Sequence, residues 1–115
     1  MSDGTQPVNR QQVLWSKLAV DFPDDPKVIV AGYAAELAYI RCTLRAKAAM
    51  TDGVIHRARV GRWLAGIPGR AEKHMAALVS AGLIETCDEG WRIPLEVWRK
   101  WNKTADEIFS QFARR

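Results

Sequence analysis

Cysteine is scarce in this sequence: Cys42 and Cys87 are the two present, and they lie far apart. Neither belongs to a Cys-x-x-Cys pair or to a Cys/His spacing that binds zinc. The sequence also lacks a Gly-rich phosphate loop and a Ser/Cys–His pattern with a positioned carboxylate. These absences predict a protein that is not an enzyme, with no catalytic residues, no cofactor and no metal. Both cysteines are expected to behave as small apolar residues in a reducing compartment.

Long apolar runs are missing as well. The longest uncharged run near the middle, Val28–Ala35, is too short to cross a bilayer. The opening stretch MSDGTQPVNRQQ is polar and lacks the apolar segment of a signal peptide. We therefore expect a cytoplasmic protein without a membrane partner. Apolar residues still make up 48% of the 115 residues, and five residues are tryptophan, which indicates one compact domain with a real core.

The chain has a formal net charge of +4, and its positive charge is concentrated in one part of the sequence. Residues 1–53 carry six basic and six acidic residues, whereas residues 54–82 carry five basic residues and one acidic residue. Residues 83–91 carry three acidic residues, and residues 92–115 again have an excess of basic ones. The basic segment is either a solvated surface or the binding face for an acidic partner.

The N-terminal part has three sections. Residues 1–12 are expected to be a flexible tail. Val13–Phe22, which contains Trp15, is an apolar run that fits either a strand or an extended arm across the core. Asp24-Asp25-Pro26 predicts a helix start, because aspartate caps a helix and proline suits its first position. Gly32 is expected to end this short helix.

The segment Tyr33–Met50 has a clear helical period. The large apolar residues on one face are Tyr33, Leu37, Ile40 and Leu44, with Ala48. The small residues on the opposite face are Ala35, Ala38, Cys42, Ala46 and Ala49. Apolar residues on both sides predict contacts on both sides. The helix is then either sandwiched inside the domain, or its small-residue face forms a dimer interface.

The next part predicts a turn at residues 51–53, a short strand at Val54–His56 and two helices. The helices are expected over Arg57–Leu64 and Arg70–Ala81, joined by a tight turn at residues 66–69. The residues predicted to face inward are Val60, Trp63, Leu64, Ala71, Met75, Leu78 and Val79.

Gly82 is expected to cap the second of these helices. A hairpin follows, with strands at Leu83–Cys87 and Trp91–Ile93 and an Asp-Glu-Gly tip between them. After Pro94, LEVWRKWN predicts a helical turn or two. Residues 104–107 form a capping box that opens a last helix. The apolar stripe predicted on that helix is Ile108, Phe109 and Phe112.

The order of these elements is typical of a winged helix-turn-helix, in which a Gly-containing turn joins the second and third helices. We therefore expect a mainly α protein with a small β-hairpin. The winged helix-turn-helix domain is placed at residues 13–94, and residues 95–115 are expected to form a C-terminal helical extension that packs on it. In this fold the third helix is the usual reader of the DNA major groove.

The arginines of the basic segment then lie on the two helices of the helix-turn-helix. The residues that we predict to bind DNA are Arg57, Arg59, Arg62, Arg70, Lys73 and Ser80. Cations of this kind contact phosphates and supply most non-specific affinity. However, the wing tip Asp88-Glu89 is acidic, and the reading face has no Asn or Gln for base edges. DNA binding is therefore weak and mostly electrostatic, or the third helix faces a protein partner.

The aromatic and histidine side chains are assigned structural roles. The tryptophans follow helix and strand faces, so we expect them to pack in the core and against the C-terminal segment rather than stack on bases. His74 is predicted to be a half-buried filler, and His56 a structural residue at the end of a strand.

Several stretches, taken in order over about residues 14–108, resemble one family. They are LWSKLAVDFPDDPKV, AAELAYIRC, MTDGVI, ALVSAGLIE, GWRI and WRKWNKTADEI. Together they are similar to the N-terminal winged-helix domain of phage and prophage replication-initiation proteins, the DnaD-like replisome organisers. The resemblance implies DNA binding at a phage origin or regulatory region, often as an oligomer, in the cytoplasm of a bacterial host.

We therefore predict a non-enzymatic protein of phage or mobile-element origin that binds double-stranded DNA in replication initiation or its regulation. The expected partners are double-stranded DNA, further copies of the chain in a homo-oligomer, and a host or phage replication protein. The alternative is a protein-interaction module, either a phage factor that binds a host protein or a homodimerising winged helix, with little DNA binding of its own.

Overall fold

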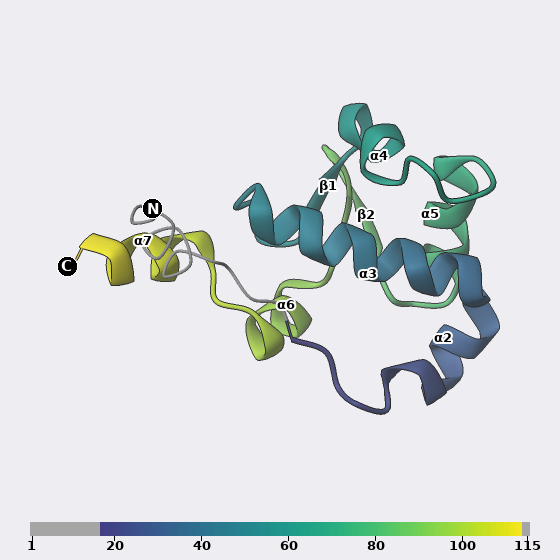
Figure 1. Cartoon of the computed structure of the whole chain (residues 1–115), viewed down its shortest axis with the longest axis horizontal. Coiled ribbons are helices and arrows are strands. Elements are labelled where there is room, and N and C mark those ends of the chain that lie inside the picture. The colour runs from purple at the N-terminus through teal and green to yellow at the C-terminus, as the bar shows by residue number, and fades with distance from the viewer. Residues whose placement is uncertain (1–16, 114–115) are drawn as a thin grey trace, which may run out of the picture.

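The computed structural model describes residues 17–113, which form a mainly helical protein with one small sheet (Figure 1). The helices are η1 (Phe22–Asp24), α2 (Pro26–Ala31), α3 (Tyr33–Ala48), α4 (Arg57–Trp63), α5 (Ala71–Ser80), α6 (Leu95–Trp101) and α7 (Ala105–Ala113). The strands are β1 (Val54–His56), β2 (Glu85–Cys87) and β3 (Gly90–Arg92). In Figure 1, α3 crosses the middle of the molecule, with α4 above it and α2 and α6 below. The tail predicted at residues 1–12 and the side chain of Trp15 lie outside the described residues.

The helix α2 begins where the sequence predicts it. Oδ1 of Asp25 accepts a hydrogen bond from the backbone N–H of Lys27 at 2.9 Å, and Pro26 takes the first helical position. Ahead of it, residues 17–21 contain no strand, so the strand that was one of two predictions for Val13–Phe22 is absent from its described part. Phe22 instead begins η1 and stacks on Tyr39 of α3, with 5.2 Å between the ring centroids.

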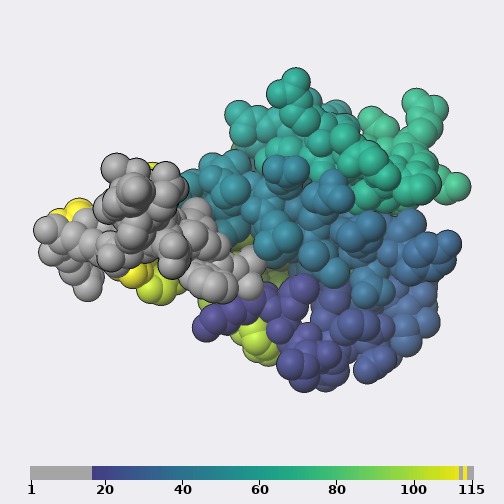
Figure 2. All heavy atoms as spheres, viewed as in Figure 1, coloured from purple at the N-terminus to yellow at the C-terminus, as the bar shows by residue number. Residues whose placement is uncertain are grey.

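The long helix α3 buries its small-residue face. Ala38, Cys42 and Ala46 are at most 1% exposed and belong to the core, because small side chains let the neighbouring elements approach closely. The opposite face is open: Tyr33 is 89% exposed and Leu44 52%. Figure 2 shows atoms of α3, in blue, on the surface toward the viewer. The prediction of a helix sandwiched on both sides is therefore wrong, and so is its alternative, a dimer interface on the small-residue face.

The three strands form an antiparallel sheet in the order β1-β3-β2. Ile55 of β1 and Thr86 of β2 both lie opposite Trp91 of β3. The hairpin between β2 and β3 turns at Asp88-Glu89, and Gly90, which was predicted in the tip, is the first residue of β3. β2 is shorter than the predicted Leu83–Cys87, and β3 begins and ends one residue before the predicted Trp91–Ile93. A strand before the helix-turn-helix, paired with a hairpin after it, gives the winged-helix-like arrangement that the order of elements predicted.

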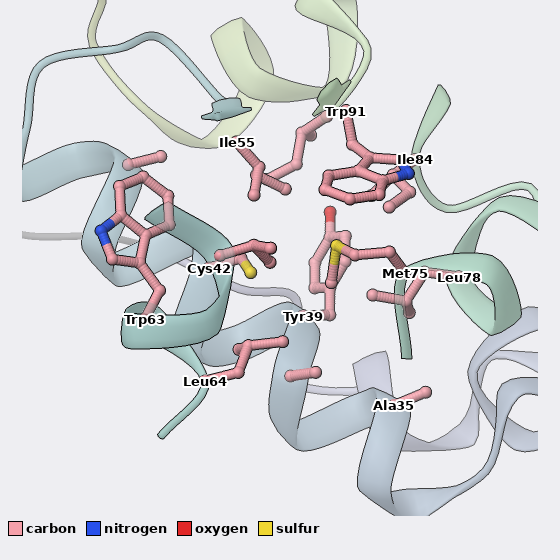
Figure 3. Packing of buried hydrophobic residues seen from close by; sticks show 14 of the residues in the cluster. Ala35, Tyr39, Cys42, Ile55, Trp63, Leu64, Met75, Leu78, Ile84 and Trp91 are labelled. Carbon is pink, nitrogen blue, oxygen red and sulfur yellow. The ribbon is translucent and has the colours of Figure 1, made fainter. Parts of the chain in front are cut away.

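The core lies between α3, α5 and the sheet. Figure 3 shows Tyr39 and Cys42 of α3 close to Met75 of α5, with Ile55 and Trp91 of the sheet on the far side. Full burial of a large apolar side chain contributes about 1.5–3 kcal/mol. All residues predicted to face inward from the two central helices are buried or half-buried: Val60, Trp63, Leu64, Met75 and Leu78 are buried, and Ala71 and Val79 are half-buried.

The helix α7 is attached to the rest of the protein by hydrogen bonds at its start. The predicted capping box is present: the Thr104 N–H donates to Oε1 of Glu107 at 2.7 Å, and the Glu107 N–H donates to Oγ1 of Thr104 at 3.3 Å. The Ala105 N–H donates to Oδ1 of Asp52 at 2.7 Å, and Nζ of Lys47 donates to the carbonyl oxygen of Lys103. These contacts tie α7 to the end of α3 and the turn after it.

The other predictions about apolar side chains are mostly confirmed. Trp63, Trp91 and Trp98 are buried in the core, and Trp101 is half-buried. On α7, Ile108 is buried but Phe109 is exposed, which differs from the single stripe predicted there. Among the described residues, no helix has the length and apolar character needed to span a membrane.

Candidate nucleic-acid interface

The end of α4 is held by an arginine that the sequence analysis did not single out. Nη1 of Arg41, on α3, donates to the carbonyl oxygens of Trp63 at 3.3 Å and Ala65 at 3.1 Å. Carbonyls at the C-terminal end of a helix lack donors within the helix, and the guanidinium supplies the missing donors. This contact fixes α4 against α3. A lone arginine in a helical pattern gives no signal of such a role in the sequence.

The start of α5 is held by His74, which is more buried than predicted. Its Nε2 lies 2.7 Å from the carbonyl oxygen of Pro68 and hydrogen-bonds to it. A Cβ atom at Gly69 would lie 3.1 Å from the same nitrogen, so the ring fills the space directly under the turn. The histidine is therefore a structural filler, as predicted, and it positions the turn between α4 and α5.

Four of the predicted cations extend from these two helices into solvent. Arg59 and Arg62 lie on α4, Arg70 is the N-cap residue of α5, and Lys73 lies in its first turn. We call these four residues the basic face. Within residues 17–113, none of the four side chains makes a hydrogen bond or an ion pair. Exposed cations without protein partners can contact phosphates without first breaking an internal bond.

The residues predicted on α5 are spread along the helix. Arg70 and Lys73 lie within one turn of each other, whereas Ser80 is exposed at the other end, about 10 Å from Lys73 along the axis at 1.5 Å per residue. The structure thus brings the two cations together and leaves Ser80 apart. The ten residues of α5 span about 15 Å, similar to the roughly 12 Å width of the DNA major groove.

Arg57 differs from the basic face because it is engaged by the wing. Its guanidinium lies over the Trp91 ring, 5.1 Å from the centroid, and its backbone N–H donates to the carbonyl oxygen of Glu89 at 2.9 Å. The cation–π contact holds the charge at the surface where α4 meets the hairpin. Arg57 therefore belongs to the base of the wing.

The close approach between the wing and α4 depends on Gly90. Its φ is 148°, and a Cβ atom there would lie 2.6 Å from the carbonyl oxygen of Ile55 and 2.8 Å from the backbone nitrogen of Arg57. Backbone atoms on both sides leave no room for any side chain. The sequence marked this glycine as part of a hairpin tip but did not show the contact with α4.

The wing tip carries the opposite charge to the basic face. Asp88 and Glu89 are exposed. The Glu89 backbone N–H and the Cys87 thiol hydrogen-bond to the Glu89 carboxylate and hold its pKa below the usual value, and nearby His56 and Arg92 act in the same direction. The carboxylate is therefore ionised at neutral pH, and it repels phosphate at the place where a DNA-binding wing would approach the duplex.

Exposed cations also occur on α6, at Arg99 and Lys100. Nζ of Lys100 lies 5.3 Å from the centroid of the Trp101 ring. In Figure 1, α6 lies on the other side of α3 from α4, so these cations do not extend the basic face.

No group of three His, Cys, Asp or Glu side chains in residues 17–113 is arranged to hold a metal ion. No protein-family model, no curated protein and no solved structure matches this chain. The resemblance to phage replication proteins therefore stays a prediction, and the fold and the basic face are the basis for any proposal about function.

Proposed function

We propose that this protein is a non-enzymatic, winged-helix-like protein that binds double-stranded DNA through α4 and α5. The observation that carries the proposal is the basic face, four exposed cations on the two helices of the helix-turn-helix, none of them with a side-chain partner among the described residues. The phosphate backbone is the ligand that such an array suits best, because each cation that neutralises a phosphate releases a counterion.

In this proposal α5 lies along the major groove and the cations at its start contact the flanking phosphates. Ala76 is exposed on α5, and its small side chain lets a groove wall come close. The exposed face of α5 has few groups that read base edges, so we expect modest sequence preference and strong dependence on salt.

The biological setting proposed is the cytoplasm of a bacterial host, where the protein acts in replication initiation of a phage or mobile element, or in its regulation. What supports this setting is the series of stretches that resembles phage replication-initiation proteins, from LWSKLAVDFPDDPKV to WRKWNKTADEI. A helix-turn-helix with a phosphate-binding face is compatible with that role.

The test is fluorescence anisotropy with a labelled random-sequence duplex, titrated with the full chain at several salt concentrations. The double variant Arg70→Ala/Lys73→Ala removes two phosphate contacts. At about 1 kcal/mol for each contact, affinity should fall about thirtyfold. The slope of log affinity against log salt should also become shallower by about 1.8.

The matched control is Lys27→Ala/Arg99→Ala, which removes the same charge from exposed positions on α2 and α6. It should bind almost as well as the parent protein. Unchanged binding by folded Arg70→Ala/Lys73→Ala protein, or an equal loss in both double variants, would contradict the proposal.

The second candidate function is a protein-interaction module, and one observation favours it. The acidic wing tip and the small residues at the exposed side of α5, Ala76 and half-buried Ala77, suit a protein surface better than a polyphosphate. In that case the folded protein fails to bind the duplex even at low salt.

A further inference from the structure

The outer face of α3 carries large apolar residues that the described part of the fold leaves open. Tyr33, Leu37, Ile40 and Leu44 follow one another at spacings of four, three and four residues, so they lie in one row along the helix. Tyr33 is 89% exposed, Leu37 45% and Leu44 52%, and Ile40 is half-buried. We call these four residues the outer stripe. Contiguous apolar surface of this kind is uncommon on monomeric proteins and marks a contact site.

Neither the core nor the proposed DNA binding uses the outer stripe. The core is built on the opposite face of α3, from Ala38, Cys42 and Ala46. The basic face is on α4 and α5, away from the outer stripe. A separate contact is needed to explain why α3 carries large apolar residues on its exposed face.

A second series of apolar residues precedes the helices in the sequence. Val13, Leu14 and Trp15 are consecutive, and Leu18 and Val20 follow them. Residues 13–16 lie outside the described residues, whereas Leu18 and Val20 are described and are 39% and 101% exposed. The sequence left two alternatives for this run, a strand or an extended arm, and residues 17–21 contain no strand. The arm is the alternative that remains.

The chain is attached to α3 directly after this series. The ring of Phe22 stacks on the ring of Tyr39, with 5.2 Å between the centroids. The backbone N–H of Phe22 also donates to the carbonyl oxygen of Ala19 at 3.0 Å, which closes a turn and holds the Cα atom of Ala19 within about 7 Å of that of Phe22. Tyr39 directly precedes Ile40 in α3, so the arm starts close to the middle of the outer stripe.

The arm is long enough to cover the second half of the outer stripe. Trp15 lies four residues before Ala19, and four extended residues span about 13 Å. Leu44 lies five residues after Tyr39, which is about 7.5 Å along the helix axis. Figure 2 shows the start of the described chain, in purple, and α3, in blue, on the same face of the molecule.

The short connection to α3 makes the chain's own arm the favoured occupant of this surface. A segment tethered by a few residues is present at an effective concentration on the order of millimolar or more, whatever the concentration of the protein. A weak apolar contact is therefore made within the chain before a separate molecule makes it. The indole of Trp15 supplies the necessary apolar area, since a tryptophan buries about 150–250 Å².

We propose that Val13–Leu18 is an arm that lies along the outer face of α3, with the indole of Trp15 packed on Ile40 and Leu44. The arm covers the half of the outer stripe that is nearer the end of α3. It leaves α4 and α5 free. This proposal stands independently of DNA binding, because it rests on a different face.

The experiment is NMR spectroscopy of the full chain with labelled isoleucine and leucine methyl groups and no DNA present. The indole protons of Trp15, identified by their loss in Trp15→Ala, should show nuclear Overhauser effects to the methyl groups of Ile40 and Leu44. The same effects should be seen at about 50 µM and 500 µM protein, because a contact within one chain does not depend on protein concentration.

Urea denaturation tests whether the same contact stabilises the fold. Trp15→Ala should lower the urea midpoint by about 0.5–1 M. Leu44→Ala should lower it too, and the double variant should lose less than the sum of the two single losses, because both variants remove one contact.

The matched control for this cycle is Val30→Ala, since Val30 is 79% exposed on α2, beyond the other end of the outer stripe. The midpoint changes of Trp15→Ala and Val30→Ala should add in the double variant. Val20→Ala should leave the midpoint unchanged, because the side chain of Val20 is fully exposed.

Three outcomes would overturn the proposal. The first is a folded full chain in which Trp15 shows no effect to Ile40 or Leu44, which would leave the outer stripe to a separate molecule. The second is a contact that appears only at the higher protein concentration, which would place it between two copies of the chain. The third is a Trp15→Ala/Leu44→Ala variant whose midpoint loss equals the sum of the single losses.

Discussion

The two faces of α3 are both apolar, yet one is buried in the core and the other is exposed. The inner face, with Ala38, Cys42 and Ala46, is in the core, and the outer face, with Tyr33 and Leu44, is open to solvent. Hydrophobicity alone would place the larger residues inside. Ala38, Cys42 and Ala46 let the sheet and α5 approach α3 closely, and Tyr39 is the large residue that the core accommodates on the same side.

The comparison also explains why the sequence pattern of α3 does not show which of its faces is buried. A helix with one polar face shows which side is buried. Here both faces are apolar, so the pattern alone leaves the orientation open. The face that is buried is then set by the space beside α3 once the other elements have packed, and the exposed face stays open unless another surface covers it.

The sharpest way to test this comparison is to place the same residue on each face. Ala46→Arg introduces a large charged side chain at a position with no exposure, and should cost at least about 3 kcal/mol of unfolding free energy or prevent folding. Ala48→Arg, two residues later and exposed, should change it by less than about 0.5 kcal/mol. Urea denaturation of the two variants checks this, and similar losses for both would show that the assignment of faces is wrong.

A second pair compares a crowded glycine with an open one. Gly90→Ala places a Cβ atom against backbone atoms of β1 and α4, and should cost about 3 kcal/mol or more. Gly66→Ala meets nothing within 4 Å, so the remaining penalty is that of its φ of 92°, about 1–2 kcal/mol. Thermal and urea unfolding should rank the variants in this order, and equal losses would mean that backbone strain, and not contact with α4, is what Gly90 relieves.

The buried polar groups on the inner face predict a loss of stability at alkaline pH. Burial raises the pKa of the Cys42 thiol to about 12, from an ordinary value of 9.0. Between these values the folded chain keeps a proton that the unfolded chain releases. The contribution of this thiol to stability should therefore be constant below pH 9 and then fall with rising pH, by up to about 1.4 kcal/mol for each pH unit.

The control for this prediction is Cys42→Ala, which should remove the loss between pH 9 and pH 10. A further loss above pH 10 should remain, because burial also raises the pKa of Tyr39 to about 12. Urea denaturation at pH 8, 9 and 10 measures the effect. A parent protein as pH-dependent as Cys42→Ala over this range would show that the thiol is not shielded from water.

The smallest effect is expected at the wing tip, where the substitutions change only the surface charge. Asp88→Asn/Glu89→Gln removes two negative charges from the tip and should raise affinity for a random duplex by about three- to tenfold at low salt. The gain should shrink as salt is added. Glu96→Gln/Asp106→Asn, which makes the same charge change on α6 and α7, should leave the affinity nearly unchanged. A gain that does not depend on salt would contradict an electrostatic cause.

Local features of the fold were readable from the sequence, because their causes lie within a few residues. The Asp25 cap and the Thr104–Glu107 capping box formed as predicted, and the hairpin turns within the predicted Asp-Glu-Gly tip. The candidate site was predicted in part. The exposure of the basic face followed from helical spacing, whereas the contact of Arg57 with Trp91 joins residues far apart in the chain, and spacing could not show it.

The sequence by itself determined the order of helices and strands, the caps that bound them and the position of the basic segment, since each depends on propensity and periodicity over short stretches. Only the tertiary structure decided which face of α3 is buried, that Arg41 holds the end of α4, and that Gly90 lets the wing reach it. Each of these depends on the space between distant segments, and that space exists only once the chain has packed.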